Sequence, residues 1–328
     1  MRFAICYAVS MNGPRRIVSL LSSATEILYL MGLGDRVVGV SHECDYPDNV
    51  RLKPQVTRSN VDSTAGSRAI DDQGKSLLAT GGPLYEIDVA TLVALEPDLI
   101  VTQAQCDACA VRYEDVLAAI NDQPVLRGVP IVALNPRSLT DVLEDIERVA
   151  IAADVCETGK RIIAELVNRI DAVRRKSLSA DRPRVACIEW TDPLMLAANW
   201  MPELVQLAGG VHGLTQAKVQ SGYSTWDDLI GYNPQVIVVM PCGFDLDRSV
   251  AEAIALALRP GWLQLDAVKT GRVFAVDANS YFNRSGPRLV ESLELLAHFI
   301  HPKAFDSPAT VDANRTFQVM RNEVGKML

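Results

Sequence analysis

The sequence predicts an α/β fold made of two Rossmann-like lobes with parallel sheets, joined by a single long backbone helix. Apolar runs rich in β-branched residues alternate along the chain with amphipathic segments of helical spacing. This alternation occurs in both halves of the chain, with similar residues at matching positions. Between the halves lies a long stretch without proline, 137–182, that has helical periodicity. These three observations favour two similar lobes and one helical connection.

The first half opens with Arg16–Leu21, an apolar run expected to form a buried strand, and continues with a short amphipathic helix over 25–32 that ends near Gly32. Further along, a helix ending at Pro97 is followed by the apolar run 98–102. Runs that are apolar at successive positions are typical of strands buried on both faces of a parallel sheet.

The second half repeats this order. Arg184–Trp190 is its first predicted strand, and the helix over 202–209 matches the helix over 25–32 nearly position for position. A helix ending at Pro234 then leads into the apolar run 235–239, as Pro97 leads into 98–102. We therefore predict an N-terminal lobe over 15–138 and a C-terminal lobe over 181–302.

The connection over 139–180 is predicted to contain two helices that are separated near Thr158 and Gly159. Apolar residues in the second helix recur at 162, 163, 166, 167, 170 and 173, which places them on one face. A helix from about 159 to 178 is roughly 30 Å long, so we expect it to allow only small tilts between the lobes. The remaining residues, 303–328, are predicted to form a C-terminal tail or helix.

Composition and charge exclude several classes of protein. The 328 residues are 48% hydrophobic and 22% charged, which is ordinary for a globular protein and excludes disorder. The net charge of −8 disfavours nucleic-acid binding, because nucleic-acid binders normally present a basic surface. No apolar run approaches the roughly 18–20 residues that a membrane span requires.

The first residues and the cysteines bear on localisation. The apolar stretch 3–9 is at the lower limit for a secretory signal, and Cys6 comes too early for a lipoprotein signal. Either Met1 or Met11 could be the natural start. The seven cysteines are an odd number in a long chain, which is typical of a reducing compartment rather than of a disulfide framework. We predict a cytoplasmic protein, with a periplasmic or exported one as the alternative.

Candidate ligand contacts follow the predicted strands, because ligands of parallel α/β sheets bind beyond the carboxyl ends of the strands. Aromatic side chains at such positions suit a large, flat, partly apolar ligand, and an arginine there could reach a ligand anion. The alternatives are rings that fill the lobe cores, and arginines, including Arg288, that cap helices or form ion pairs. The predicted ligand-binding residues are Tyr46, Tyr85, Trp190, Trp200, Phe244, Tyr281, Phe282 and Arg284.

Thiols at the same predicted positions form a candidate metal site for zinc or another soft metal. The pair Cys106 and Cys109 has metal-ligand spacing, but a second close pair is absent. The alternatives are reduced, partly buried thiols, or redox chemistry at the start of a helix. No role is assigned to Cys6, Cys156 and Cys187. The candidate metal ligands are Glu43, Cys44, Cys106, Cys109 and Cys242.

Catalysis has no positive signature in the sequence. The glycine-rich nucleotide-binding motifs and the Gly-x-Ser-x-Gly motif of serine hydrolases are absent. Glu43, Asp45 and Glu189 could form an acid–base set, but carboxylates near a crevice also position ligands. We predict that the protein is not an enzyme.

Several motifs carry a resemblance to a known family. Its general marks are Arg-Ile-Val-Ser-Leu at 16–20, Glu-Pro-Asp-Leu-Ile-Val at 96–101 and Tyr-Phe-Asn-Arg-Ser-Gly-Pro-Arg at 281–288. Over residues 16–302 the chain resembles the iron/cobalamin periplasmic-binding-protein family, which has the class III substrate-binding fold. It looks most like a cobalamin-binding subgroup, through Ser-His-Glu-Cys-Asp-Tyr-Pro at 41–47, Cys-x-x-Cys-Ala at 106–110 and Met-Pro-Cys-Gly-Phe-Asp-Leu at 240–246.

The resemblance implies a cobalamin, a related corrinoid or an iron-chelate ligand held between two lobes, and an ABC importer as partner if the protein is exported. By position, the family's cleft aromatics match Tyr46, Trp190, Trp200, Tyr281 and Phe282. The leading hypothesis is therefore a non-catalytic ligand-binding protein. The alternatives are a cytosolic metal-binding protein or metal-dependent enzyme that uses the cysteines, and a partner-binding protein that kept the fold but not the ligand.

Overall fold

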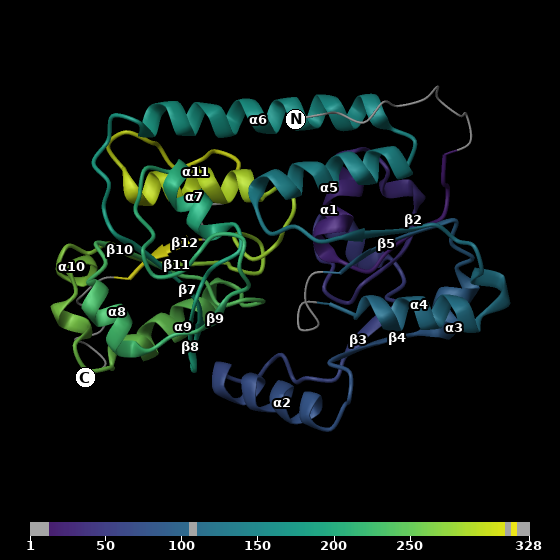
Figure 1. Cartoon of the computed structure of the whole chain (residues 1–328), viewed down its shortest axis with the longest axis horizontal. Helices are drawn as coiled ribbons and strands as arrows, with labels where there is room; N and C mark the ends of the chain where they lie inside the picture. Colours follow the sequence, from purple (N-terminus) through teal and green to yellow (C-terminus); the bar gives the residue numbers. More distant parts are fainter. Residues whose placement is uncertain (1–12, 105–109, 312–315, 320–328) are drawn as a thin grey trace. The chain divides into compact units, whose positions relative to one another are not determined.

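The computed structural model describes residues 13–104, 110–311 and 316–319. The chain divides into two compact units: unit 1 is Met1–Pro136 with Thr140–Glu165, and unit 2 is Arg137–Leu139 with Leu166–Leu328. Each unit contains its own sheet with a parallel core (Figure 1). The predicted α/β class with two lobes is thereby confirmed. The boundary falls inside a helix, between Glu165 and Leu166, and not at the ends of a separate connecting segment.

Unit 1 is built on a four-stranded parallel sheet in the order β2-β1-β5-β6. The two central strands are buried at every position, as their continuous apolar runs predict. Helices α1 and α4 follow strands β1 and β5 of this sheet, and α3 precedes β5. The elements are β1 (Ile17–Ser19), α1 (Ser22–Leu30), η1 (Gly34–Arg36), β2 (Val37–Val40), α3 (Val89–Ala94), β5 (Leu99–Gln103), α4 (Tyr113–Asp122), η3 (Pro124–Leu126) and β6 (Ile131–Leu134).

An antiparallel hairpin in unit 1 has no counterpart in the predicted alternation. Strands β3 (Thr57–Ser59) and β4 (Tyr85–Ile87) pair with each other, although 25 residues separate them. Between them lies α2 (Ser67–Ala79), which Figure 1 shows in blue, and η2 (Asp48–Leu52) precedes β3. These strands are only three residues long, too short to show a clear two-residue period in the sequence.

Two long helices follow β6, namely α5 (Leu139–Ala152) and α6 (Cys156–Ser177). The predicted helix over 159–178 therefore exists but begins three residues earlier, and Gly159 lies inside it. A Cβ atom on Gly159 would lie 2.4 Å from the Cβ of Ala150 on α5. Gly159 thus allows the two helices to approach closely, and it does not break a helix.

Unit 2 is built on a six-stranded sheet in the order β12-β11-β10-β7-β8-β9. Its core, β11-β10-β7, is parallel, whereas β12, β8 and β9 pair antiparallel at the two edges. The tail expected over 303–328 supplies β12, because Thr316–Gln318 pairs with β11. The strands are β7 (Val185–Thr191), β8 (Leu194–Leu196), β9 (Gly222–Tyr223), β10 (Val236–Val239), β11 (Val273–Val276) and β12 (Thr316–Gln318).

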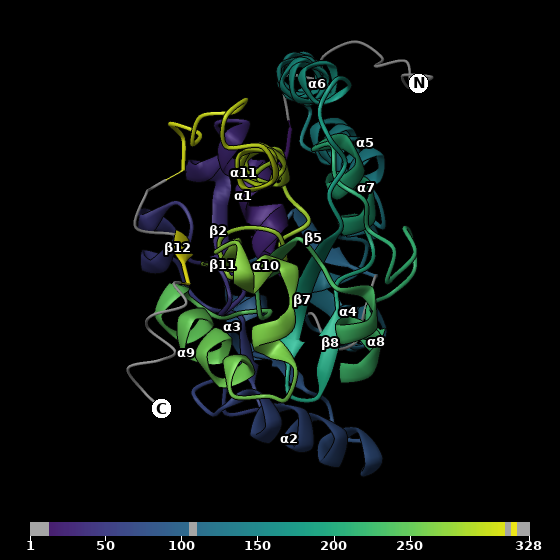
Figure 2. The ribbon, with the colours of Figure 1, turned by 90° about the vertical axis from the view of Figure 1, so that its left-hand side faces the viewer.

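Helices cover both faces of the unit 2 sheet (Figures 1 and 2). Helices α8 and α9 pack on one face through a core that includes Ile188, Ile237 and Trp262, while α7 and α11 contact each other and lie on the other face. The helices are α7 (Met201–Leu207), α8 (Trp226–Tyr232), α9 (Leu246–Ala257), η4 (Trp262–Gln264), α10 (Asp266–Lys269) and α11 (Leu289–Ile300).

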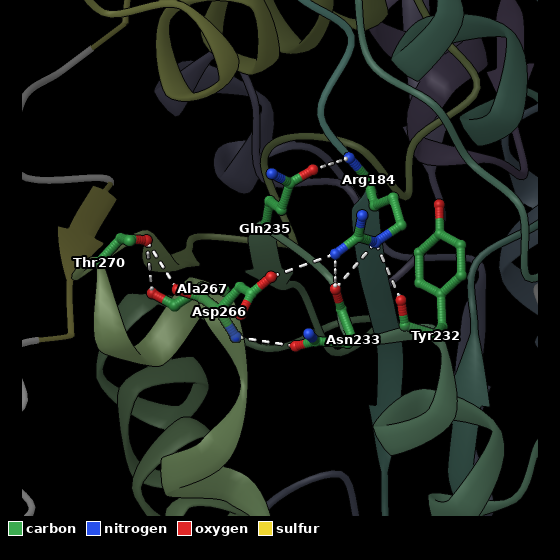
Figure 3. A network of polar contacts seen from close by, with 7 residues as sticks. All are labelled: Arg184, Tyr232, Asn233, Gln235, Asp266, Ala267 and Thr270. Atoms are coloured by element: carbon green, nitrogen blue, oxygen red, sulfur yellow. Dashed lines mark hydrogen bonds and ion pairs between the residues drawn. The ribbon is translucent and has the colours of Figure 1, made fainter.

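A polar network holds the amino end of β7 (Figure 3). The Arg184 guanidinium donates to the main-chain carbonyls of Tyr232 and Asn233 and pairs with Asp266 at 3.2 Å. The main-chain N–H of Asp266 donates to the Asn233 side chain, and that of Arg184 donates to Gln235. Asn233 ends α8 with a φ of 47°, a left-handed conformation that asparagine tolerates. The network fixes the end of β7 that is opposite its carboxyl end.

Candidate functional site

The carboxyl ends of β7 and β10 bring two predicted ligand contacts together in unit 2. The Trp190 ring meets the Phe244 ring edge-on, with centroids 5.3 Å apart. The Arg248 guanidinium lies 3.6 Å from the centroid of Phe244. Phe244 directly precedes Asp245, the N-cap of α9, which accepts a hydrogen bond from the Arg248 main-chain N–H. The cap therefore fixes the start of α9, and with it the position of Arg248 beside Phe244.

Strand register extends this pair into a longer surface. Trp190 of β7 is opposite Met195 of β8, and Met195 is opposite Tyr223 of β9. Residues directly opposite each other on paired strands point to the same face of a sheet. Phe244, Trp190, Met195 and Tyr223 therefore form a series that we call the aromatic row. Because paired strands lie about 4.8 Å apart, the row spans about 10 Å between Trp190 and Tyr223.

Met195 and Tyr223 were not predicted as site residues. Tyr223 is 57% exposed and lies in a two-residue strand, so its neighbourhood carries no periodic signal. Its pairing with Met195 joins positions 28 residues apart, which the sequence pattern alone does not reveal. The tertiary pairing of β8 and β9 makes this part of the surface visible.

Two other predicted contacts, Trp200 and Phe282, are packed inside the molecule. The Trp200 side chain is buried, and its indole Nε1 donates to the Phe282 carbonyl at 2.7 Å. Phe282 is fully buried, with a φ of 70°, and its N–H donates to the Ser292 hydroxyl at 2.9 Å. These contacts lie within unit 2 and hold the start of α7 against the segment that precedes α11.

The same segment contains Tyr281 and Arg284. Tyr281 is 6% exposed, and the Arg288 guanidinium lies 5.5 Å from its ring centroid. Arg284 is 8% exposed and donates to the Asn279 side-chain oxygen at 2.9 Å. Asp277, at the end of β11, accepts hydrogen bonds from the N–H and hydroxyl of Ser280. Side-chain hydrogen bonds therefore hold this segment in a defined conformation.

In unit 1, a hydrogen-bonded cluster follows β2. The Nδ1 atom of His42 lies 2.7 Å from the Thr57 hydroxyl, which also accepts from the His42 main-chain N–H and contacts the Ser41 hydroxyl. The His42 ring lies 5.5 Å from the Tyr85 ring. His42 is therefore fixed between strands β2, β3 and β4, and Tyr85 contacts it from β4.

Cys44 and Tyr46 differ in their surroundings. Cys44 is buried, and its sulfur lies 3.1 Å from the Thr25 hydroxyl, which in turn donates to the Ser19 hydroxyl. Tyr46 is 48% exposed, and it precedes Pro47 in a cis peptide bond. Cys44 thus belongs to the packing between α1 and the strand ends, whereas Tyr46 presents its ring at the surface of unit 1.

The candidate metal ligands are not gathered within the described part of the chain. Cys106 and Cys109 lie outside the described residues. Cys44 is buried in unit 1, and Cys242 is exposed in unit 2. The Glu43 carboxylate lies 3.3 Å from Nε2 of His42. Over residues 13–104, 110–311 and 316–319, no three or more His, Cys, Asp or Glu side chains form a group suited to a metal.

Two cysteines without an assigned role have distinct states. Cys187 is a free, buried thiol, and burial raises its pKa to about 12, which makes it a poor nucleophile and metal ligand. Cys156 is disulfide-bonded, so the expectation of fully reduced thiols is not met. Neither residue contributes to the candidate site.

The three carboxylates considered for acid–base chemistry occupy different units. Glu43 and Asp45 belong to unit 1, where Asp45 pairs with Arg51 at 3.7 Å. Glu189 belongs to unit 2, where it accepts a 2.6 Å hydrogen bond from the Ser221 hydroxyl. Burial raises the pKa of Glu189, and the Ser221 hydrogen bond partly opposes that rise. This pattern is that of a structural or ligand-positioning carboxyl group.

Comparison with known proteins places these features in a family. A family model described as "Periplasmic binding protein" matches residues 17–280. The "Uncharacterized ABC transporter substrate-binding lipoprotein YvrC" of Bacillus subtilis is 26% identical over 89% of this chain and 82% of its own length. The "Vitamin B12-binding protein" of Yersinia pestis is 25% identical over 87% of this chain and 86% of its own length.

A solved structure supports the fold assignment. The periplasmic vitamin B12 binding protein BtuF of Vibrio cholerae superimposes with a TM-score of 0.64 at 24% identity, over 89% of this chain and 99% of that chain. At this identity the likeness is one of fold. It agrees with the class III substrate-binding fold that the sequence motifs implied.

These matches correct the predicted localisation. A cytoplasmic protein was expected, but the matching proteins include a substrate-binding lipoprotein and periplasmic binding proteins, which point to export. The short apolar stretch 3–9 was therefore a misleading guide, and the cytosolic alternative for the function has no support. Among the helices of the described residues, none combines the length and hydropathy needed to cross a bilayer.

Proposed function

Because the chain belongs to the periplasmic binding protein family, we propose that it is a non-catalytic substrate-binding protein of an ABC importer, and that its ligand is cobalamin or a related corrinoid. The observation that carries the choice of ligand is the aromatic row of unit 2. A related protein that is 25% identical over 87% of this chain is named for vitamin B12 binding.

The aromatic row supports a large, flat ligand. Trp190, Met195 and Tyr223 share one face of the sheet over about 10 Å. Aromatic and thioether side chains provide apolar contact surface and have few groups that need hydrogen-bond partners, which suits the face of a macrocycle. At one end of the row, Arg248 provides a positive charge beside Phe244, which suits an acidic or strongly polar substituent at the rim of such a ligand.

We propose different roles for the predicted ligand-binding residues according to their burial. Tyr46, Tyr85 and Trp190 are the proposed direct contacts, because their side chains retain exposed surface. Buried residues instead hold the wall that carries these contacts, and their substitution acts through the fold. This second group comprises Trp200, Phe244, Tyr281, Phe282 and Arg284.

The absence of catalysis is part of the same proposal. The relatives are named as binding proteins, and the carboxylates Glu43, Asp45 and Glu189 do not form one cluster within a single unit. A binding protein needs only to hold and release its ligand, so buried, hydrogen-bonded side chains around the site suffice.

Calorimetric titration of the purified protein with cyanocobalamin tests the proposal. We expect saturable binding of one ligand with a Kd in the micromolar range or below, and an at least tenfold weaker Kd for Trp190→Ala, because the ring loses its stacking contact. The matched control is Trp226→Phe. Trp226 is the first residue of α8 and stacks on the buried Trp262, so this variant should keep the Kd of the unmodified protein. The absence of any heat or spectral change at high micromolar cyanocobalamin would refute the ligand assignment.

An iron chelate remains the second candidate ligand, because the sequence motifs of the family cover both classes. Parallel titrations with a ferric siderophore and with hemin distinguish the candidates. If one of these compounds binds and cyanocobalamin does not, the ligand of the aromatic row is an iron compound. If added zinc alone binds with a stoichiometry that falls in Cys242→Ser, the thiol hypothesis regains support.

A further inference from the structure

The segment 211–224, which we call the edge segment, carries Tyr223 and runs along the free edge of the unit 2 sheet between α7 and α8. Its only strand, β9, is two residues long. Outside this strand, backbone hydrogen bonds attach the segment at Val211, at Lys218 and Val219, and at Ser224. Short edge strands are weakly held, so other contacts must fix the position of Tyr223.

Side-chain hydrogen bonds supply these contacts. At one end, the His212 ring lies 3.1 Å from the Ala197 carbonyl and 2.6 Å from the Thr215 hydroxyl. Burial lowers the pKa of His212, which favours the neutral ring. At the other end, the Ser221 hydroxyl accepts from the Ala198 N–H at 2.9 Å and donates to Glu189 at 2.6 Å.

Glu189 connects the edge segment to the ligand surface by two routes. Its carboxyl group holds Ser221, which precedes the β9 pair Gly222 and Tyr223. Its main-chain carbonyl accepts from the Cys242 N–H at 3.1 Å, two residues before Phe244. Trp190 follows Glu189 on β7, where the register with β8 is shifted between Ile188 and Trp190. Glu189 is thus adjacent to the aromatic row and connected to both of its ends.

Resting on the proposed function, we propose that Glu189 is a positioning residue: through its hydrogen bond to Ser221 it holds β9 so that Tyr223 stays in line with Met195 and Trp190, and it thereby sets ligand affinity without touching the ligand. The partly buried carboxyl group can serve this role because a hydroxyl partner stabilises it in either protonation state. When that partner is lost, a partly buried acid loses its hydrogen bond and β9 loses a contact that keeps Tyr223 in register.

Cyanocobalamin titrations of matched variants test this role. Ser221→Ala and Glu189→Ala should each weaken the Kd about five- to tenfold, and the double variant should be no weaker than either one, because both remove the same contact. Glu189→Gln keeps a neutral hydrogen-bond acceptor of the same size and should bind within about twofold of the unmodified protein. The control is Ser224→Ala in the same segment, whose hydroxyl makes no hydrogen bond within the described residues; its Kd should not change.

Three outcomes overturn the proposal: an unchanged Kd in both Ser221→Ala and Glu189→Ala, additive losses in the double variant, or a Glu189→Gln variant as weak as Glu189→Ala. A second readout does not depend on the ligand. Amide hydrogen exchange of the peptide that covers 219–224 should be faster in Ser221→Ala and Glu189→Ala than in Ser224→Ala.

The two readouts separate the inference from the proposed function. If cyanocobalamin fails to bind the unmodified protein, the ligand assignment fails. The amide exchange rates of 219–224 alone then test whether Glu189 positions β9. Faster exchange then supports the positioning role, and equal exchange in all three variants overturns it.

Discussion

Arg169 of α6 and Glu294 of α11 form a two-point ion pair within unit 2, with Nε and Nη2 of the arginine 2.9 and 2.7 Å from the two carboxylate oxygens. Both side chains are largely covered, and the hydrogen bonds that Arg169 donates to Glu294 raise the pKa of Arg169. The C-terminal part of α6 is thereby tied to a helix that covers the unit 2 sheet. This contact joins residues 125 positions apart in the sequence.

Removing this pair should lower stability. We expect Arg169→Met to reduce the free energy of unfolding by about 1–3 kcal/mol, because Glu294 loses a two-point charged partner in a partly dry site. The control is Arg161→Met on the same helix, whose partner Glu165 is 61% exposed; it should cost less than about 0.5 kcal/mol. Urea unfolding measures both. Equal losses in the two variants would contradict the assigned difference.

Trp200 should prove to be a stability residue. Trp200→Phe removes the indole N–H that pairs with the Phe282 carbonyl and leaves that buried carbonyl unsatisfied, so we expect a loss of about 1–3 kcal/mol and a lower Tm. Ligand affinity at a temperature where the variant is folded should change less than threefold. Trp190→Ala should show the opposite pattern, with a weak Kd and a nearly unchanged Tm. A large loss of affinity in a fully folded Trp200→Phe would place its ring at the ligand instead.

Cys242 and Cys187 should differ in reactivity. Cys242 is exposed, whereas Cys187 is buried with its pKa raised to about 12. At pH 8 only about one Cys187 side chain in ten thousand is a thiolate. Because the side chain is buried, an alkylating reagent such as iodoacetamide cannot reach it. Peptide mapping after brief iodoacetamide treatment should therefore show label on Cys242 and none on Cys187, and unfolding in urea should expose Cys187. Labelling of Cys187 in the native protein would contradict its burial.

Asp145 on α5 should make stability depend on pH. It is fully buried, and burial, partly opposed by Arg148, raises its pKa from 3.8 to about 7. Because the folded state binds the proton more tightly than the unfolded state, stability falls as the pH rises from about 4 to about 7 and then levels off. Asp145→Asn should be more stable than the unmodified protein at pH 8, by about 2–4 kcal/mol, and should lack this part of the pH dependence.

Chemical denaturation at pH 5 and pH 8 measures this effect. The matched control is Asp141→Asn, one turn earlier on the same helix, for which we expect a smaller change because the residue retains exposed surface. If Asp145→Asn is destabilised equally at both pH values, the ionised carboxylate is needed for packing and the assigned direction is wrong.

The local sequence pattern predicted strands correctly where the strand is buried on both faces. The run Leu99–Val101 is apolar because β5 has neighbours on both edges and is covered on both faces, and the same holds for Val236–Val239 in β10. The pattern failed where elements are short or meet at an edge. Strands β3 and β9 have three and two residues, and neither has a period that a reader of the sequence could detect.

The sequence pattern also could not distinguish aromatic residues at the ligand surface from those in the interior. Trp190 and Trp200 were both predicted as ligand contacts, yet Trp190 lies in the aromatic row while Trp200 donates to a main-chain carbonyl in the interior. The difference depends on which strand or helix lies opposite each ring. The neighbour of Trp190 is Phe244, 54 positions away in the chain, and the neighbour of Trp200 is Phe282, 82 positions away.

The amino-acid order by itself determined the α/β class, the duplicated lobes, the long helix and the family, because these depend on hydrophobic periodicity and on motifs that are contiguous in the chain. Only the tertiary structure decided which aromatic side chains are exposed, that Met195 and Tyr223 continue from Trp190, and that Glu189 holds Ser221. The physical reason is that side-chain exposure and partnership are set by strand pairing between distant segments, and a sheet joins residues that no local pattern connects.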